Sequence, residues 1–144
     1  MHPYPHLYHA ATSGGPTAFV TVTSAGLPDL SSASPPEFDG PGGVWSPETL
    51  LCAAVADCFV LTFRAIARAS KLEWVSLDCS VEGTLDRVEG VTRFTRYVTR
   101  ATLQITPGTD RGKAQTLLEK SEHGCLVANS LTGTRELIAL VIEG

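Results

Sequence analysis

The pattern of apolar and polar positions predicts one long helix near the middle of the chain. Over residues 46–70 apolar side chains occupy almost every position of the central part. Ser46 suits the N-cap, Pro47 suits the first helical position, and Glu48 lies in the first turn, where the helix dipole favours an anion. A helix that is apolar nearly all round is typical of the interior of a protein. We therefore expect a buried central helix.

Alternation of apolar and polar residues predicts strands on both sides of this helix. The expected strands cover residues 17–24, 27–31, 75–82, 92–105 and 135–143. A second helix is expected to start at Thr109 or Asp110, run through Lys120 and end at Gly124, and a short helix follows over residues 125–131.

The expected architecture is a single α+β domain over residues 1–144, with the long buried helix packed against antiparallel sheets. A helix this long and apolar is hard to cover within a chain of 144 residues. Its far side needs a partner surface, and a second copy of the chain is the commonest partner. We therefore expect a homodimer with the helix near the interface.

Charge and composition narrow the function classes. The net charge is −4, and residues 1–63 contain no Lys or Arg, so no basic surface for nucleic acid or an anionic membrane is expected. The longest nearly apolar run, residues 50–63, contains Asp57 and is shorter than the roughly 18 residues that a membrane span needs. No secretory signal is visible in M-H-P-Y-P-H-L-Y-H, so we expect a cytoplasmic protein.

Four cysteines in a reducing compartment are expected to be free, catalytic or redox-active. Cys58 is either a small buried packing residue or a reactive thiol, and Cys52 on the same helix is ambiguous. The two lie about 9 Å apart along the helix and about 120° apart around it, so they cannot bridge to each other. Cys79 is expected to pack in a strand. Cys125 either opens the short helix, where its pKa would be lowered, or simply lies near a turn.

Other kinds of site have weaker support. His2, His6, His9 and His123 suggest a metal site, but their spacing is not that of a zinc motif, and we expect no bound metal. Neither a nucleophile elbow, a Walker loop nor a dinucleotide-binding fingerprint occurs in the sequence, and we expect no cofactor.

Two motifs resemble those of the OsmC/Ohr family. S-P-E-T-L-L at residues 46–51, followed by C-F at residues 58–59, is similar to the Asn-Pro-Glu-x-Leu motif that precedes the family's reactive Cys on a central helix. G-C-L-V-A-N at residues 124–129 is similar to the family's second Cys segment. The order of elements also matches, and the resemblance covers most of the chain.

The resemblance implies a thiol-dependent peroxidase acting on organic hydroperoxides. Cys58 would be the peroxidatic Cys and Cys125 the resolving Cys, and the oxidised pair would be reduced by a dithiol such as a lipoylated protein. It further implies an intertwined homodimer with active sites at the interface. Glu48 and Cys58 lie ten residues, about 15 Å, apart along one helix. Glu48 would therefore have to enter the site from the partner subunit.

The chain departs from the family pattern at several positions. The family's peroxidases carry an activating Arg in the N-terminal half, whereas the first cation here is Arg64. Asp57 adjoins Cys58, and a carboxylate disfavours a thiolate. Leu126 replaces the usual Pro. Arg64, six residues past Cys58, or an Arg of the partner chain could replace the missing cation. The alternative is an OsmC-like protein with weak or no peroxidase activity that binds a ligand or senses thiol redox state.

Overall fold

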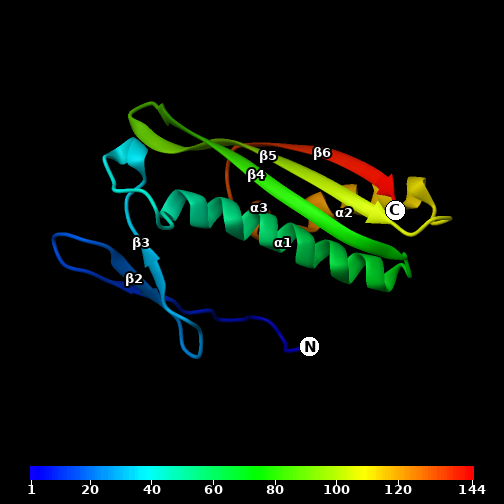
Figure 1. Ribbon diagram of the computed structural model, residues 1–144, viewed down its shortest axis with the longest axis horizontal. Helices are drawn as coiled ribbons and strands as arrows, with labels where there is room; N and C mark the ends of the chain where they lie inside the picture. Colours follow the sequence, from blue (N-terminus) through cyan, green and yellow to red (C-terminus); the bar gives the residue numbers. More distant parts are fainter. The chain divides into compact units, whose positions relative to one another are not determined.

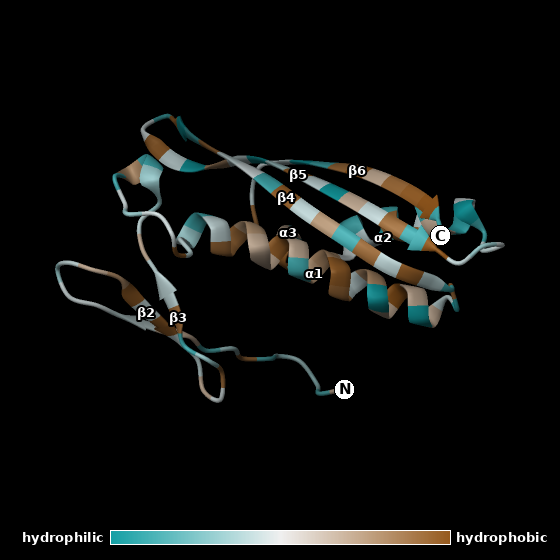
Figure 2. Ribbon diagram, viewed as in Figure 1, coloured by the Kyte–Doolittle hydropathy of each residue, from teal (hydrophilic) through white to brown (hydrophobic).

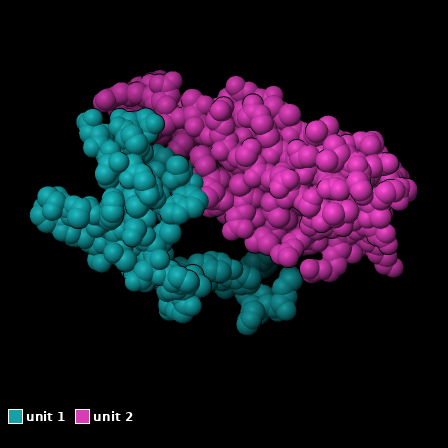
Figure 3. Space-filling model, viewed as in Figure 1, with its two compact units in different colours: residues 1–50 teal, residues 51–144 magenta.

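The structure is a computed structural model that describes all 144 residues, and its elements follow the predicted α+β order (Figure 1). The chain forms two compact units, residues 1–50 and residues 51–144 (Figure 3). The predicted α+β class with one long helix is confirmed. That residues 1–144 act as one domain stays a prediction.

The N-terminal unit contains a small antiparallel sheet in the order β1-β2-β3. Its strands are β1 (Ala11–Ser13), β2 (Val20–Thr23) and β3 (Leu30–Ser32). β1 was not predicted, and β2 starts later than predicted because Ala18 adopts a left-handed backbone conformation with φ of 68°. A single 3-10 turn, η1 (Pro36–Phe38), interrupts the predicted loop that follows.

The second unit contains a larger sheet in the order β4-β5-β6. β4 (Trp74–Val88) and β5 (Val91–Ile105) form a hairpin closed by Glu89 and Gly90. Both turn residues have positive φ, as a two-residue hairpin turn requires.

The last strand, β6 (Thr134–Glu143), runs parallel to β5. The predicted antiparallel pairing holds for β4 and β5 but not for β6, so this sheet is mixed. The reason is the connection between β5 and β6, which contains the helices α2 and α3. A helical crossover of this kind lets the next strand run in the same direction as the previous one.

The helices begin at the residues that the sequence indicated. In α1 (Pro47–Ala69) the backbone N–H of Thr49 donates to the Ser46 hydroxyl oxygen at 3.2 Å. In α2 (Arg111–Gly124) the backbone N–H of Lys113 donates to the Asp110 carboxylate at 3.0 Å. Ser46 is the predicted N-cap of α1, and Asp110 is one of the two residues predicted to cap α2. Each satisfies one free N–H of the first turn. α3 (Leu126–Asn129) is one short turn.

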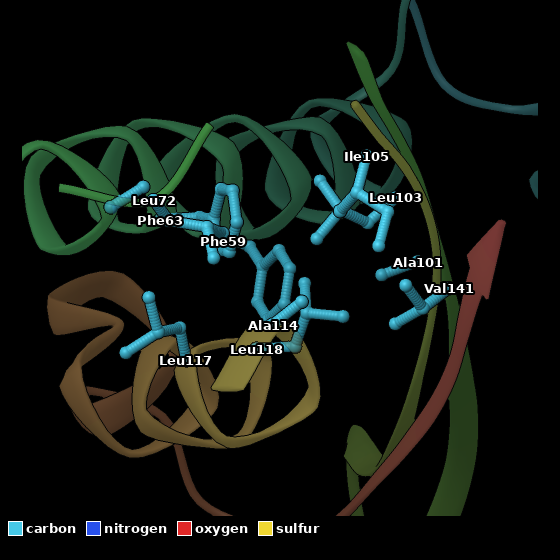
Figure 4. Close-up of a cluster of buried hydrophobic side chains, with 11 residues drawn as sticks. Phe59, Phe63, Leu72, Ala101, Leu103, Ile105, Ala114, Leu117, Leu118 and Val141 are labelled. Atoms are coloured by element: carbon cyan, nitrogen blue, oxygen red, sulfur yellow. The ribbon is translucent and has the colours of Figure 1, made fainter. Parts of the chain in front are cut away.

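α1 and α2 pack against one face of the β4-β5-β6 sheet (Figure 4). Phe59 and Phe63 of α1 are completely buried and contact Leu118 of α2 and the apolar residues of β5. The core consists of Phe59, Phe63, Ala67, Leu72, Ala101, Leu103, Ile105, Ala114, Leu117, Leu118 and Val141.

The predicted burial of α1 holds for one face only. Val55, Phe59, Phe63 and Ala67 recur at helical spacing and are buried, whereas Leu61 on the opposite side is 49% exposed. Figure 2 shows apolar residues along much of this helix. An 18-residue window of α1 has a mean hydropathy of 2.0, so the helix is long and apolar enough to cross a membrane, although the run was expected to be too short. A helix in a protein core can have the same length and hydropathy, and the contacts of α1 are those of a core helix.

Candidate thiol site

Cys58 lies at the edge of the buried face of α1 and is partly exposed. Its sulfur is 3.8 Å from the hydroxyl of Thr62, one turn further along the helix. No hydrogen bond or ion pair joins Cys58 to an Arg, Lys or His of the same chain. Asp57, its neighbour in sequence, is exposed. Within one chain the thiol therefore has a hydroxyl neighbour but no activating cation.

Cys125 lies at the junction between α2 and α3 and is almost completely buried, with 1% exposed. Its sulfur is 3.8 Å from the carbonyl oxygen of Val55 on α1. Cys58 packs against the buried cluster formed by Val55, Cys125 and Ala128. The fold therefore brings together the two thiols to which the sequence analysis assigned the peroxidatic and resolving roles. Those roles stay predictions.

The pKa of Cys125 is raised to about 11, chiefly by burial and to a smaller extent by the neighbouring Cys58 thiol, while the Ala128 N–H acts in the opposite direction. Of the two alternatives for Cys125, the one with a pKa lowered at the start of a helix is wrong. α3 has only four residues, so its dipole is small, and the loss of solvation dominates. Cys125 is a protonated thiol at neutral pH.

Cys79 faces the core from β4. Its pKa is raised to about 12, chiefly by burial and to a smaller extent by Cys125 and Glu122. Val81, two residues along the same strand face, packs against the Cys58 and Cys125 cluster. The predicted packing role of Cys79 agrees with this position, because its side chain packs against the apolar core.

Cys52 faces the sheet rather than the other thiols. A Cβ placed on Gly83 of β4 would lie 3.0 Å from the Cys52 sulfur, so helix and strand are in close contact here. Burial raises the pKa of Cys52, and the Gly83 N–H lowers it. The sequence left the role of Cys52 open. The structure narrows it, because Cys52 lies outside the cluster of Cys58 and Cys125.

Glu48 lies in the first turn of α1 and borders a cavity of about 450 Å³ within the N-terminal unit. Pro35, Phe38 and Pro41 give this cavity apolar walls. Glu48 forms no ion pair. It is ten residues from Cys58 on one continuous helix, about 15 Å along the axis. The two residues are therefore not neighbours within one chain.

Three residues near the thiols were not singled out from the sequence. Thr62 could have been found, because it lies four positions after Cys58 on a predicted helix. Glu122 and Arg135 form an ion pair of 2.8 Å between the end of α2 and the start of β6. No sequence spacing signals that pair, because it depends on how the chain turns around Cys125.

The candidate metal ligands do not come together. No group of three or more His, Cys, Asp or Glu side chains is arranged to hold a metal ion. His6 instead contacts Tyr8 and the backbone of His2, at 3.3 and 2.9 Å. His123 lies in the last turn of α2.

Comparison with known proteins finds similarity over most of the chain. A family model described as OsmC-like protein matches residues 40–137, which include both motifs. The organic hydroperoxide resistance protein of Xanthomonas axonopodis pv. citri (strain 306) is 31% identical over 130 residues, or 87% of this chain and 86% of that protein. Uncharacterized protein YmaD of Bacillus subtilis (strain 168) is 28% identical over 135 residues, or 92% of this chain and 90% of that protein.

Solved structures share the fold over nearly the whole chain. An organic hydroperoxide resistance protein OsmC from Legionella pneumophila is 26% identical with a TM-score of 0.75, over 97% of this chain and 99% of that chain. An OsmC-like protein of unknown function from Vibrio cholerae has a TM-score of 0.82 at 18% identity, over 96% of this chain and 100% of that chain. The second likeness concerns the fold alone.

Proposed function

Because this chain belongs to the OsmC/Ohr family, we propose that it is a thiol-dependent peroxidase that reduces organic hydroperoxides. The observation that carries the proposal is the packing of Cys58 and Cys125 in one cluster. A relative that is 31% identical is named an organic hydroperoxide resistance protein, which supports the substrate class.

The reaction proceeds in two steps at the two sulfurs. The Cys58 thiolate attacks the terminal oxygen of the hydroperoxide, the O–O bond breaks, and the alcohol leaves after taking a proton. The resulting sulfenic acid on Cys58 is attacked by Cys125, which forms a disulfide and releases water. A dithiol such as a lipoylated protein reduces the disulfide. The raised pKa of Cys125 keeps its thiol protonated. This thiol therefore carries the proton that the sulfenic acid oxygen needs in order to leave as water.

A homodimer would complete the site. The exposed face of α1, with Leu61 at 49%, supports a partner surface on this helix. In such a dimer Glu48, with the cavity beside it, would approach Cys58 of the other copy, and the apolar part of the cavity wall would suit an organic substrate. Arg64 lies on the exposed part of α1 and is the first cation of the chain, so it is the candidate for the activating charge.

A second candidate function follows from the surroundings of Cys58. No cation contacts this thiol within the chain, and its side-chain hydrogen-bonding neighbour is the hydroxyl of Thr62. If the partner copy brings no cation, peroxidase activity is weak or absent. The chain would then bind an apolar ligand or sense thiol redox state through the same two cysteines.

Consumption of cumene hydroperoxide with dihydrolipoamide as reductant tests the proposal. The wild type should turn over, and Cys58→Ser should reduce turnover to the uncatalysed background. Cys52→Ser is the matched control on the same helix, and it should leave turnover unchanged. Absence of turnover that depends on Cys58 would exclude the peroxidase and favour the second candidate.

A further inference from the structure

Arg135 contacts both sides of the chain segment that carries Cys125. Its Nε donates to the Glu122 carboxylate at 2.8 Å, and its Nη2 donates to the Glu122 carbonyl oxygen. Its Nη1 donates to the side-chain oxygen of Asn129 at 2.8 Å. Glu122 lies in the last turn of α2, and Asn129 is the last residue of α3. One guanidinium therefore bridges the two helices that meet at Cys125.

Asn129 closes this arrangement. Its side-chain NH₂ donates to the carbonyl oxygen of His123 at 3.0 Å, and its backbone N–H donates to the carbonyl oxygen of Cys125 at 2.9 Å. The residues on both sides of Cys125 are thus held to each other and to the start of β6. We refer to Glu122, Asn129 and Arg135 as the junction clamp.

The junction clamp is better shielded from water than an ordinary surface ion pair. The side chains of Arg135 and Glu122 are 26% and 16% exposed. The ion pair of Arg96 and Glu136, which joins β5 and β6, has side chains that are 52% and 46% exposed. Charge-assisted hydrogen bonds gain strength as solvent is excluded, so the clamp constrains the chain more than the exposed pair does.

Such a constraint matters because disulfide formation depends on the separation of the two Cβ atoms, which must be about 3.8 Å. Cys58 is fixed by the long helix α1. Cys125 is carried by a junction whose following helix has four residues, and a helix that short is not stable by itself. The position of the Cys125 sulfur therefore depends on contacts outside α3.

We propose that Arg135 is a positioning residue that holds the Cys125 thiol against Cys58, so that an oxidised Cys58 is resolved within the same chain. The proposal rests on the proposed peroxidase function for its biological purpose. In the resolving step the Cys125 sulfur attacks the sulfenic sulfur of Cys58, the S–S bond forms, the S–O bond breaks, and the oxygen leaves as water with the thiol proton. Arg135 touches neither sulfur and takes no part in these bond changes.

A first experiment measures the equilibrium constant for formation of the disulfide, without any peroxide. The fraction of Cys58–Cys125 disulfide is determined at equilibrium in buffers of oxidised and reduced dithiothreitol, in chains whose Cys52 and Cys79 are both replaced by Ser. Arg135→Ala should lower the equilibrium constant about tenfold, because charge-assisted hydrogen bonds that fix the junction are lost. Arg96→Ala is the matched control and should leave it unchanged.

A second experiment separates the two chemical steps. After one equivalent of cumene hydroperoxide, sulfenic acid at Cys58 is trapped with dimedone, and disulfide is followed by mass spectrometry. Arg135→Ala should form sulfenic acid at the wild-type rate and convert it to disulfide about tenfold more slowly. Arg135→Lys keeps the charge but cannot bridge Glu122 and Asn129 together, so it should restore the rate only in part.

The outcomes distinguish the clamp from the peroxidase. If Arg135→Ala folds and forms the disulfide as the wild type does in both experiments, the proposal is wrong. Equal losses in Arg135→Ala and Arg96→Ala would also overturn it, because they would indicate general destabilisation. If Arg135→Ala does not fold, Asn129→Ala removes one arm of the clamp and must show the same loss. Failure of the wild type to react with peroxide would reject the peroxidase, while the equilibrium experiment would still decide the clamp.

Discussion

The buried Cys125 lies against the partly exposed Cys58, although one thiol comes from the middle of α1 and the other from the junction of α2 and α3. Each thiol is part of the other's surroundings. The pKa of Cys125 is raised to about 11 first by burial and then by Cys58. Changes at one sulfur should therefore be measurable at the other.

Replacement of Cys58 by Ala should lower the pKa of Cys125. The mutation removes the contribution of the Cys58 thiol but leaves burial, the largest cause, in place. The pKa should fall below about 11 and stay above the ordinary range of a thiol. Ultraviolet absorbance of the thiolate measures it in chains that also lack Cys52 and Cys79. An unchanged or higher pKa would contradict the packing of the two thiols.

Stability should fall in alkaline solution. The folded chain holds the Cys125 proton up to about pH 11, whereas the unfolded chain loses it near pH 9. Between these values the folded state binds more protons, so the free energy of unfolding decreases as pH rises. Urea unfolding at several pH values tests this. Cys125→Ala should show a shallower decrease, and an equally steep decrease in that variant would show that other groups cause it.

Gly83→Ala should destabilise the fold. A Cβ at Gly83 would lie 2.9 Å from the ring of Phe94 and 3.0 Å from the sulfur of Cys52. Crowding of this kind costs about 1–3 kcal/mol in the free energy of unfolding. Addition of Cys52→Ala should restore part of the loss, because it removes one of the two contacts. Gly15→Ala is the control, since no atom lies within 4 Å of its added Cβ, and chemical denaturation measures all four chains.

Leu61→Lys should weaken self-association. Leu61 is 49% exposed on α1, opposite the face that packs on the sheet, so the proposed homodimer would bury it. A charge there should raise the dissociation constant about 30-fold or more, equivalent to about 2 kcal/mol. Analytical ultracentrifugation measures the change. Val75→Lys, at an equally exposed position on β4, is the control. A wild type that sediments as a monomer at all concentrations would reject the homodimer.

Local chemistry made much of this fold predictable. Ser46 and Asp110 cap their helices as expected, because an N-cap is decided by a few neighbouring residues. β1 was missed, because three residues give no readable alternation. The parallel pairing of β6 was missed for a different reason, since strand direction depends on how α2 and α3 cross the sheet.

The candidate site was predictable only in part. The family motifs pointed to Cys58 and Cys125, and the fold brings them together. The raised pKa of Cys125 could not be predicted, because burial of a turn residue depends on tertiary packing. Arg135 appeared only as the first residue of an apolar strand, since its partners Glu122 and Asn129 become neighbours only after the chain turns.

The connection through α2 also determines how a disulfide would change the stability of the molecule. A disulfide between Cys58 and Cys125 would enclose β4, β5 and α2 in one covalent ring. In the chain-entropy description, closing a ring of this size lowers the conformational entropy of the unfolded chain. The free energy of unfolding rises by about 4 kcal/mol as a result. The oxidised protein should then melt at a higher temperature and resist proteolysis longer than the reduced protein. A lasting peroxide load would leave the cell with the more durable form.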